Sequence, residues 1–356
     1  MTAGSEPMAD IATRKQNHLD LATTGDVGFR RTTTLFECVQ LVHDALPEIE
    51  TDSVDLSSTI LGKRLKAPIL IAAMTGGTDR ARRINRELAQ IAEERGYAFG
   101  LGSQRAMHRD PSALPTYAVR DVAPTALILG NLGIVQATAM TTAEIRELVS
   151  LVGADALCIH LNPAMELVQV EGDRDFRGGI ATLERLGNEL GVPVVVKETG
   201  CGISPSVAER VQAVGMRHVD VSGAGGTSWV AVETERAQVE AQRTLGEAFR
   251  EWGIPTAASV ALLARHGFET IFATGGIRSG LDIAKAIALG ASAGGIARSS
   301  LQALESGGRE AALAYFNGIE VELRTAMLLV GAKTLPALRA VPRVIRGELR
   351  DWIEQL

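Results

Sequence analysis

Polar side chains gather at one point in the middle of the chain, directly after an apolar run. The sequence Cys-Ile-His-Leu-Asn-Pro-Ala-Met-Glu contains His160, Asn162 and Glu166, and acidic residues follow at Glu171 and Asp173. A carboxylate can hold a divalent cation, while histidine and asparagine side chains can grip an anion. We therefore expect a ligand at this strand end. The alternative is a solvated loop whose polar residues cap a helix.

A glycine turn later in the chain has the form of an anion site. Gly275 and Gly276 are followed by Ile-Arg-Ser-Gly and a helical pattern, so backbone N–H groups lie near a helix N-terminus. Ala297 and Arg298 end the next apolar run, and α/β barrels often bind phosphate at these two places. The phosphate belongs either to a substrate or to flavin mononucleotide (FMN). Lys197 favours the flavin, because a cation beside its N1/O2 edge stabilises the reduced ring; the alternative for Lys197 is an ion pair with a carboxylate.

Eight short apolar runs alternate with amphipathic segments of helical length, which indicates repeated βα units and a parallel sheet. Eight parallel strands, each followed by a helix, predict an α/β fold of the (β/α)8 TIM-barrel class. The expected strands are residues 68–73, 98–101, 126–130, 156–161, 192–196, 218–221, 270–273 and 293–297. Helical patterns lie between them, for example at residues 82–95, 142–151, 206–214 and 279–289.

Polar or glycine-rich clusters follow all eight runs. The C-terminal ends of the strands of a TIM barrel meet at one rim, where the active site lies. Plain βα turns would not need Arg105, Asn131 or Lys197, so we place the active site at this rim. The clusters begin at Met74, Gly102, Asn131, His160, Lys197, Ser222, Gly275 and Ala297.

Two segments are longer than ordinary loops. We expect residues 1–10 to be flexible, residues 11–67 to form an N-terminal extension over the barrel mouth, and residues 68–356 to form the barrel itself. An insertion after strand six, at residues 222–255, carries Trp229 and one charged helical stretch from residue 233 to 250. Long segments at the catalytic face of a barrel often act as lids.

Composition excludes several classes of function. The formal net charge is −6, which argues against binding to nucleic acid or to an anionic membrane, and 4% aromatic residues do not supply stacking platforms for bases. The three cysteines, Cys38, Cys158 and Cys201, lack metal-ligand spacing and leave an odd thiol, as in a reducing cytoplasm; Cys158 is expected in the core. No signal sequence or membrane-spanning segment is evident. We expect a cytoplasmic protein with neither a nucleic-acid nor a membrane partner.

The strand-end clusters form an ordered set of motifs. The set is Arg14-Lys15-Gln-Asn-His18, Met74-Thr75-Gly-Gly, Gly102-Ser103-Gln-Arg105, His160-Leu-Asn162-Pro, Glu171-Gly-Asp-Arg-Asp175, Val196-Lys197-Glu198, Gly223-Ala-Gly-Gly-Thr227-Ser-Trp229 and Gly275-Gly-Ile-Arg278-Ser-Gly. In this order the motifs resemble the type 2 isopentenyl-diphosphate isomerases, which are FMN-dependent. The resemblance covers residues 14–335.

The resemblance implies a set of ligand contacts and a homo-oligomer. Substrate diphosphate would meet Arg14, Lys15, His18, Ser103, Arg105, His160 and Asn162, and Glu166 would hold Mg²⁺. Catalytic roles would fall to Lys197, His160 and the position of Met165. FMN contacts would come from Ala73, Met74, Thr75, Ser103, Asn131, Lys197, Ser222, Thr227, Gly276, Arg278, Ala297 and Arg298.

The implied reaction converts isopentenyl diphosphate to dimethylallyl diphosphate. An unactivated alkene must be protonated at one carbon and deprotonated at its neighbour, for which ordinary side-chain acids are weak. Reduced FMN can donate a proton near N5 and take one back without net redox, so NADPH would be needed only to reduce the flavin. An apolar pocket including Met165 and Trp229 would exclude water from a cationic intermediate.

One position departs from the family pattern. The family has glutamine immediately before the metal-binding glutamate, and this chain has Met165, whose thioether is a weak acceptor and no donor. Three alternatives are an FMN-dependent oxidoreductase such as a 2-hydroxy-acid oxidase, a flavin-binding protein without catalysis, and an altered activity on a related prenyl-type diphosphate. The oxidase chemistry requires a histidine base, and no histidine lies between His218 and His266.

Overall fold

The computed structural model of the chain describes residues 8–356. Eight parallel strands form a closed barrel, in which the last strand pairs with the first: Gly294 lies opposite Ile69 and Ile296 opposite Ile71. The (β/α)8 TIM barrel is therefore confirmed, and each expected strand is present. The strands are β4 Ile69–Ile71, β5 Ala98–Gly100, β6 Leu127–Gly133, β7 Ala156–His160, β8 Val194–Lys197, β9 His218–Asp220, β10 Thr270–Ala273 and β11 Ala293–Ile296.

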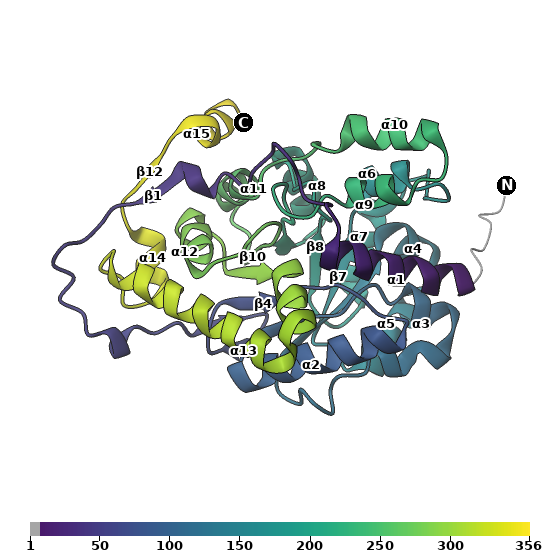
Figure 1. Ribbon diagram of the computed structural model, residues 1–356, viewed down its shortest axis with the longest axis horizontal. Helices are drawn as coiled ribbons and strands as arrows, with labels where there is room; N and C mark the ends of the chain where they lie inside the picture. Colours follow the sequence, from purple (N-terminus) through teal and green to yellow (C-terminus); the bar gives the residue numbers. More distant parts are fainter. Residues whose placement is uncertain (1–7) are drawn as a thin grey trace.

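Helices surround the barrel and pack their apolar faces against it (Figure 1). Thr78 caps α2 (Asp79–Arg95) by accepting from the N–H of Ala81, and Thr141 forms a capping box with Glu144 at the start of α5 (Thr142–Val152). The barrel helices are α2 Asp79–Arg95, α4 Ile134–Ala139, α5 Thr142–Val152, α7 Gly179–Glu189, α8 Pro205–Ala213, α11 Thr256–Leu263, α12 Gly280–Leu289 and α13 Arg298–Leu328. Within the described residues no helix is long and apolar enough to cross a membrane.

Further elements lie at the ends of the barrel and outside its ring of helices. A hairpin of β2 (Ser58–Ile60) and β3 (Lys63–Leu65) places Ile60 and Leu65 in one buried cluster with lumen side chains such as Leu70, Leu127 and Cys158. Near the C-terminus, β1 (Val39–Leu41) pairs with β12 (Arg343–Ile345). The remaining helices are α1 Met8–Thr24, α3 Arg105–Arg109, α6 Pro163–Val168, α9 Trp229–Arg236, α10 Glu240–Phe249, α14 Leu335–Ala340 and α15 Gly347–Gln355, with a 3-10 segment η3 at Pro111–Thr116.

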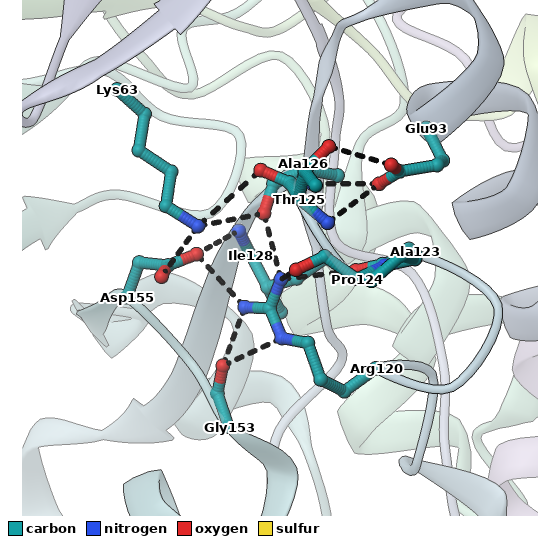
Figure 2. A network of polar contacts seen from close by, with 10 residues as sticks. All are labelled: Lys63, Glu93, Arg120, Ala123, Pro124, Thr125, Ala126, Ile128, Gly153 and Asp155. Carbon is teal, nitrogen blue, oxygen red and sulfur yellow. Dashed lines mark hydrogen bonds and ion pairs between the residues drawn. The ribbon is translucent and has the colours of Figure 1, made fainter.

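A polar network closes the barrel at the N-terminal ends of β6 and β7 (Figure 2). Asp155 accepts from Lys63 at 2.8 Å, from Arg120 at 2.9 Å and from the N–H of Ile128 at 2.8 Å. Glu93 accepts from the N–H groups of residues 125 and 126. Burial alone would raise the pKa of Asp155, but these donors outweigh it and hold the pKa below its ordinary value. The network lies at the end opposite the strand ends that carry the predicted site.

The structure corrects some sequence-based boundaries. Asn131-Leu132-Gly133 was expected to follow strand three, but these residues continue β6 because they pair with β7 up to His160. The single helical stretch expected at residues 233–250 is two helices, α9 and α10, which are separated by Ala237 in an extended conformation. Of the flexible N-terminus expected over residues 1–10, residues 1–7 lie outside the described part, and α1 begins at Met8.

Candidate active site

A cavity of about 580 Å³ lies at the C-terminal ends of the strands. Every residue to which the sequence assigned a catalytic, FMN, diphosphate or metal contact lines it, including residues from α1, which packs beside α9 and α13 (Figure 1). The cavity thus brings together segments that are hundreds of residues apart. The predicted residues in its wall are Arg14, Lys15, His18, Ala73, Met74, Thr75, Ser103, Arg105, Asn131, His160, Asn162, Met165, Glu166, Lys197, Ser222, Thr227, Gly276, Arg278, Ala297 and Arg298.

The glycine turn after β10 forms a tight backbone cradle. Gly276 has φ +77°, and a Cβ atom there would lie 2.4 Å from a methyl group of Thr34 and 2.8 Å from the carbonyl oxygen of Gly225. The N–H groups of Gly276 and Ile277 have no backbone acceptor among residues 8–356. Open N–H groups beside a helix N-terminus suit a phosphate.

Two arginines complete the positive side of this cradle. Arg278 and Arg298 both line the cavity, and burial together with the charge of Arg278 lowers the pKa of Arg298. The Arg298 guanidinium also donates to the carbonyl oxygens of Ala22 at 2.8 Å and Gly25 at 2.6 Å. The same arginine therefore connects the cradle to the C-terminal end of α1.

Lys197 at the end of β8 has both of the neighbours considered from the sequence, a ligand cavity and a carboxylate. It lines the cavity, and its ammonium group lies 3.2 Å from the carboxylate of Asp220. Asp220 is buried, and it also accepts from the hydroxyl of Thr274 and from the N–H of Ser222 at 3.3 Å. Ser222 has the unusual φ of +38° for a residue with a side chain. One carboxylate thus fixes three groups of the cavity wall.

These features fit an FMN. The hydroxyl of Thr75 is buried in the wall and has no hydrogen-bond partner among the described residues, so it is available to a polar group of a ligand. Lys197 supplies a cation to the same cavity, and the glycine cradle supplies a phosphate site. The residues present therefore match the chemistry of a flavin ring with a phosphate tail.

His160 is held as a neutral group. Burial, followed by the charges of Lys197 and Arg105, lowers the pKa of His160 to about 4. Its Nδ1 atom lies 2.8 Å from Oδ1 of Asn131, which also lines the cavity. The ring can therefore exchange hydrogen bonds with a ligand near neutral pH but brings no positive charge to it.

Glu166 lies on α6 with its carboxylate oriented by two donors. Asn162 donates to one oxygen and the N–H of Asp173 to the other, both at 2.8 Å. Within the described residues no three His, Cys, Asp or Glu side chains cluster as a metal centre. A single carboxylate still fits Mg²⁺, which usually keeps waters and takes phosphate oxygens from a substrate. Glu171, expected beside the ligand, is instead exposed on the loop after α6 and is not part of the cavity wall.

Two residues of α1 close the mouth of the cavity. Lys15 donates to the hydroxyl of Tyr117 at 2.6 Å, and Nε2 of His18 lies 2.8 Å from the carboxylate of Glu233 on α9. Burial is the main reason that the pKa of Lys15 falls to about 7 and that the pKa of His18 lies below its ordinary value. Lys15 and His18 therefore bring basic groups of α1 to the cavity wall, beside Tyr117 and Glu233.

Sequence reasoning missed several residues of the site. Asp220, Tyr117 and Glu233 contact predicted residues, whereas Gln136 and Gln169 line the cavity themselves. Asp220 lies inside an expected strand and was the easiest to find, because a carboxylate in an apolar run is unusual. Tyr117 and Glu233 follow no strand end, so no local pattern singled them out.

Comparisons with known proteins agree with this geometry. The family described as FMN-dependent dehydrogenase matches residues 9–112 and 162–342. An isopentenyl-diphosphate delta-isomerase of Methanothermobacter thermautotrophicus is 44% identical, over 97% of this chain and 96% of that protein. The enzyme of that name from Halobacterium salinarum is 44% identical, over 96% of this chain and 96% of that protein. The one from a Nostoc species is 43% identical, over 93% of this chain and 95% of that protein.

Solved structures with the same fold are more distant in sequence. A mutant mandelate oxidase with an FMN adduct has a TM-score of 0.66 at 18% identity, covering 92% of this chain and 95% of its own. A putative lactate oxidase of Pediococcus acidilactici has a TM-score of 0.66 at 16% identity, covering 96% of this chain and 94% of its own. At such low sequence identity, the similarity to these structures shows a shared fold and nothing more.

Proposed function

Because the chain belongs to the type 2 isopentenyl-diphosphate delta-isomerase family, within the FMN-dependent dehydrogenases, we propose that it converts isopentenyl diphosphate to dimethylallyl diphosphate. The observation that carries the proposal is one cavity whose wall holds the glycine turn with Arg278 and Arg298 and also a second basic set that includes Lys15 and Arg105. The glycine cradle and Lys197 suit a flavin phosphate and ring, while Lys15, Arg105 and Glu166 suit a diphosphate with its metal.

Bound FMN, once reduced by NADPH, would supply a proton donor and acceptor at N5 that is strong enough for an alkene. The chain's own residues would bind the flavin and orient it. Thr75, Ser222 and Thr227 would hold the ring, Arg278 and Arg298 its phosphate. Lys197, fixed by Asp220, would hold a positive charge beside the ring edge.

At the other end, Arg14, Lys15, His18 and Arg105 would bind the diphosphate, and Glu166 would bind Mg²⁺. Asn162 would donate to a phosphate oxygen, and neutral His160, whose Nδ1 donates to Asn131, would accept at Nε2 from a protonated oxygen or a bound water of the ligand. Met165 and Trp229 would line the alkene pocket and exclude water from developing positive charge. Segment 11–67 would act as an extension over the mouth, because its helix α1 supplies three of these basic residues.

An FMN-dependent oxidoreductase is the second candidate, since the fold is shared with mandelate and lactate oxidases. The histidines in the wall of the described cavity are His18 and His160. Nε2 of His18 is bonded to Glu233 at the mouth, and burial together with the charges of Lys197 and Arg105 lowers the pKa of His160, which makes it a weak base. The cluster of basic residues at the mouth favours a diphosphate over a small hydroxy acid.

The test is turnover of isopentenyl diphosphate by protein loaded with FMN, under anaerobic conditions with NADPH and Mg²⁺. We expect deuterium from D₂O to enter the product, and we expect no product without a reductant. Flavin reduction by 2-hydroxy acids, with no double-bond migration, would support the oxidoreductase instead. We also propose that the enzyme works as a homo-oligomer in the reducing cytoplasm, where its three cysteines stay free thiols; size-exclusion chromatography with light scattering tests the assembly.

A further inference from the structure

Tyr117 lies beneath the basic residues at the mouth, at the end of η3. The side chain is fully buried. Its ring supports the loop after β4, because a Cβ atom on Gly76 would lie 2.1 Å from the ring carbon Cε1. The neighbouring Thr116 accepts from the N–H of Gly77 at 2.7 Å, which ties the same loop to η3. The phenol thus has a fixed position.

The hydroxyl of Tyr117 makes two hydrogen bonds. It donates to the carbonyl oxygen of Ser103 at 2.7 Å and accepts from Nζ of Lys15 at 2.6 Å. Nζ of Lys15 lies 3.4 Å from the same carbonyl oxygen and 5.2 Å from the centre of the Tyr117 ring. Because the hydroxyl proton points to Ser103, its lone pair points to Lys15. The phenol therefore sets the place of the amine.

Lys15 needs such an acceptor. The charged groups that face it are Arg14 of its own helix and Arg105 of α3, and the phenol below is uncharged. Like charges repel, and a lysine side chain has four rotatable bonds through which it can turn to solvent. A short hydrogen bond to a rigid hydroxyl opposes that movement.

We propose that Tyr117 is a positioning residue, whose hydroxyl fixes the amine of Lys15 at the anion end of the cavity beside Ser103 and Arg105. The inference rests on the proposed function, because it takes the anion to be the diphosphate of the substrate. A preorganised donor loses less conformational freedom when the anion binds, so affinity rises without a contact between Tyr117 and the ligand.

The charge state of Lys15 adds a measurable signature. With its pKa near 7, much of Lys15 is neutral at pH 8 in the absence of a ligand. A bound diphosphate favours the ammonium form, so binding takes up protons at pH 8 and takes up few at pH 6, where the amine is already charged. Loss of the Tyr117 acceptor disfavours the ammonium form of Lys15, so the pH range in which binding takes up a proton moves to lower pH.

The experiment is calorimetric titration of the full, FMN-loaded protein with inorganic pyrophosphate and Mg²⁺. Two buffers of different ionisation enthalpy give the proton uptake. We expect Tyr117→Phe to weaken pyrophosphate binding about tenfold, as for one hydrogen bond to a charged group. Its FMN affinity and kcat should stay the same while KM rises. Tyr97→Phe is the matched control: Tyr97 is also fully buried, and its hydroxyl donates to Glu320 away from the cavity.

A double-mutant cycle isolates the coupling. In a Lys15→Met background, Tyr117→Phe should have little further effect on pyrophosphate binding. An affinity of Tyr117→Phe within about twofold of wild type, or an equal loss in both backgrounds, overturns the inference. If Tyr117→Phe does not fold, Lys15→Arg replaces it. A guanidinium keeps the charge but is longer and planar, so it cannot place its donor at the same point between the phenol and the Ser103 carbonyl oxygen; weaker binding supports positioning and unchanged binding overturns it. Equal pyrophosphate binding by wild type and Lys15→Met would refute the proposed diphosphate site itself.

Discussion

At the scale of single residues, the site combines groups whose charge is fixed by their surroundings. His160 is kept neutral by burial and by the charge of Lys197, whereas the carboxylate of Asp220 offsets the charge of Lys197. Met165 lies half-buried in the same wall, one residue before Glu166. Met165 and Glu166 each give a prediction about one side chain.

We predict that Met165→Gln raises kcat. Glutamine adds a donor and an acceptor for proton transfer, and its similar length should limit the packing cost to less than about 1.5 kcal/mol. A tenfold gain corresponds to about 1.4 kcal/mol of transition-state stabilisation, which one hydrogen bond can supply. Rates of double-bond migration for both proteins with reduced FMN check this, with flavin affinity as the control. A faster wild type would contradict the proton-relay explanation.

We predict that Glu166→Gln sharply raises the Mg²⁺ concentration needed for turnover. The amide lacks the negative charge that the cation requires, while the donors Asn162 and Asp173 remain near the side chain. FMN affinity should not change, because the cradle lies on other strands. A titration of turnover with Mg²⁺, starting from chelated protein, measures the effect. Full activity of the variant in chelator would remove Glu166 from the metal site.

At the scale of elements, the site depends on turns that only glycine can form. The turn after β10 has φ +96° at Gly275 and +77° at Gly276, and backbone atoms of residue 225 approach it closely. Helices α1 and α9 then meet over the mouth through His18 and Glu233. Backbone geometry thus shapes the part of the cavity proposed for the cofactor, and side chains close the part proposed for the substrate.

We predict that Gly276→Ala abolishes FMN binding while the barrel stays folded. The new Cβ would clash with Thr34 and residue 225 and would shift the N–H groups of the cradle. Gly191→Ala is the matched control, because Gly191 has a similar φ of +85° but open space around it. The control should lose about 1 to 2 kcal/mol of stability and keep its FMN affinity. Fluorescence titration with FMN and thermal unfolding separate the two effects.

At the scale of the whole molecule, the two ends of the barrel have different roles. The cavity lies at the C-terminal ends of the strands, while the network around Asp155 and Arg120 closes the other end (Figure 2). In TIM barrels the C-terminal face carries catalysis and the N-terminal face stability. Changes to the network should therefore alter unfolding and leave ligand binding alone.

We predict that Asp155→Asn lowers the free energy of unfolding by about 1 to 3 kcal/mol and leaves FMN affinity unchanged. The pKa of Asp155 is depressed in the fold, so its contribution is present above its ordinary pKa of 3.8 and is lost as the pH falls below that value. The variant should thus show a weaker loss of stability in acid. Denaturant unfolding at pH 7 and pH 3 checks both statements; an identical acid dependence of the two proteins would count against the role of Asp155.

The sequence by itself determined the barrel and most of the cavity wall. Buried strands read as apolar runs, and their C-terminal ends must meet at one rim, so the order of the runs along the chain was enough to place residues such as Thr75, Lys197 and Arg298 together. Glycines at the turn after β10 were also recognisable, because a positive φ favours this residue.

Only the tertiary structure decided which groups support that wall and which charges they carry. Tyr117 reaches Lys15 across 102 positions and Glu233 reaches His18 across 215, and no local periodicity reports such contacts. The neutral state of His160 follows from burial and from a charge on the next strand. Periodicity in a sequence records how one segment meets the core, whereas the protonation and orientation of a side chain depend on every segment packed around it.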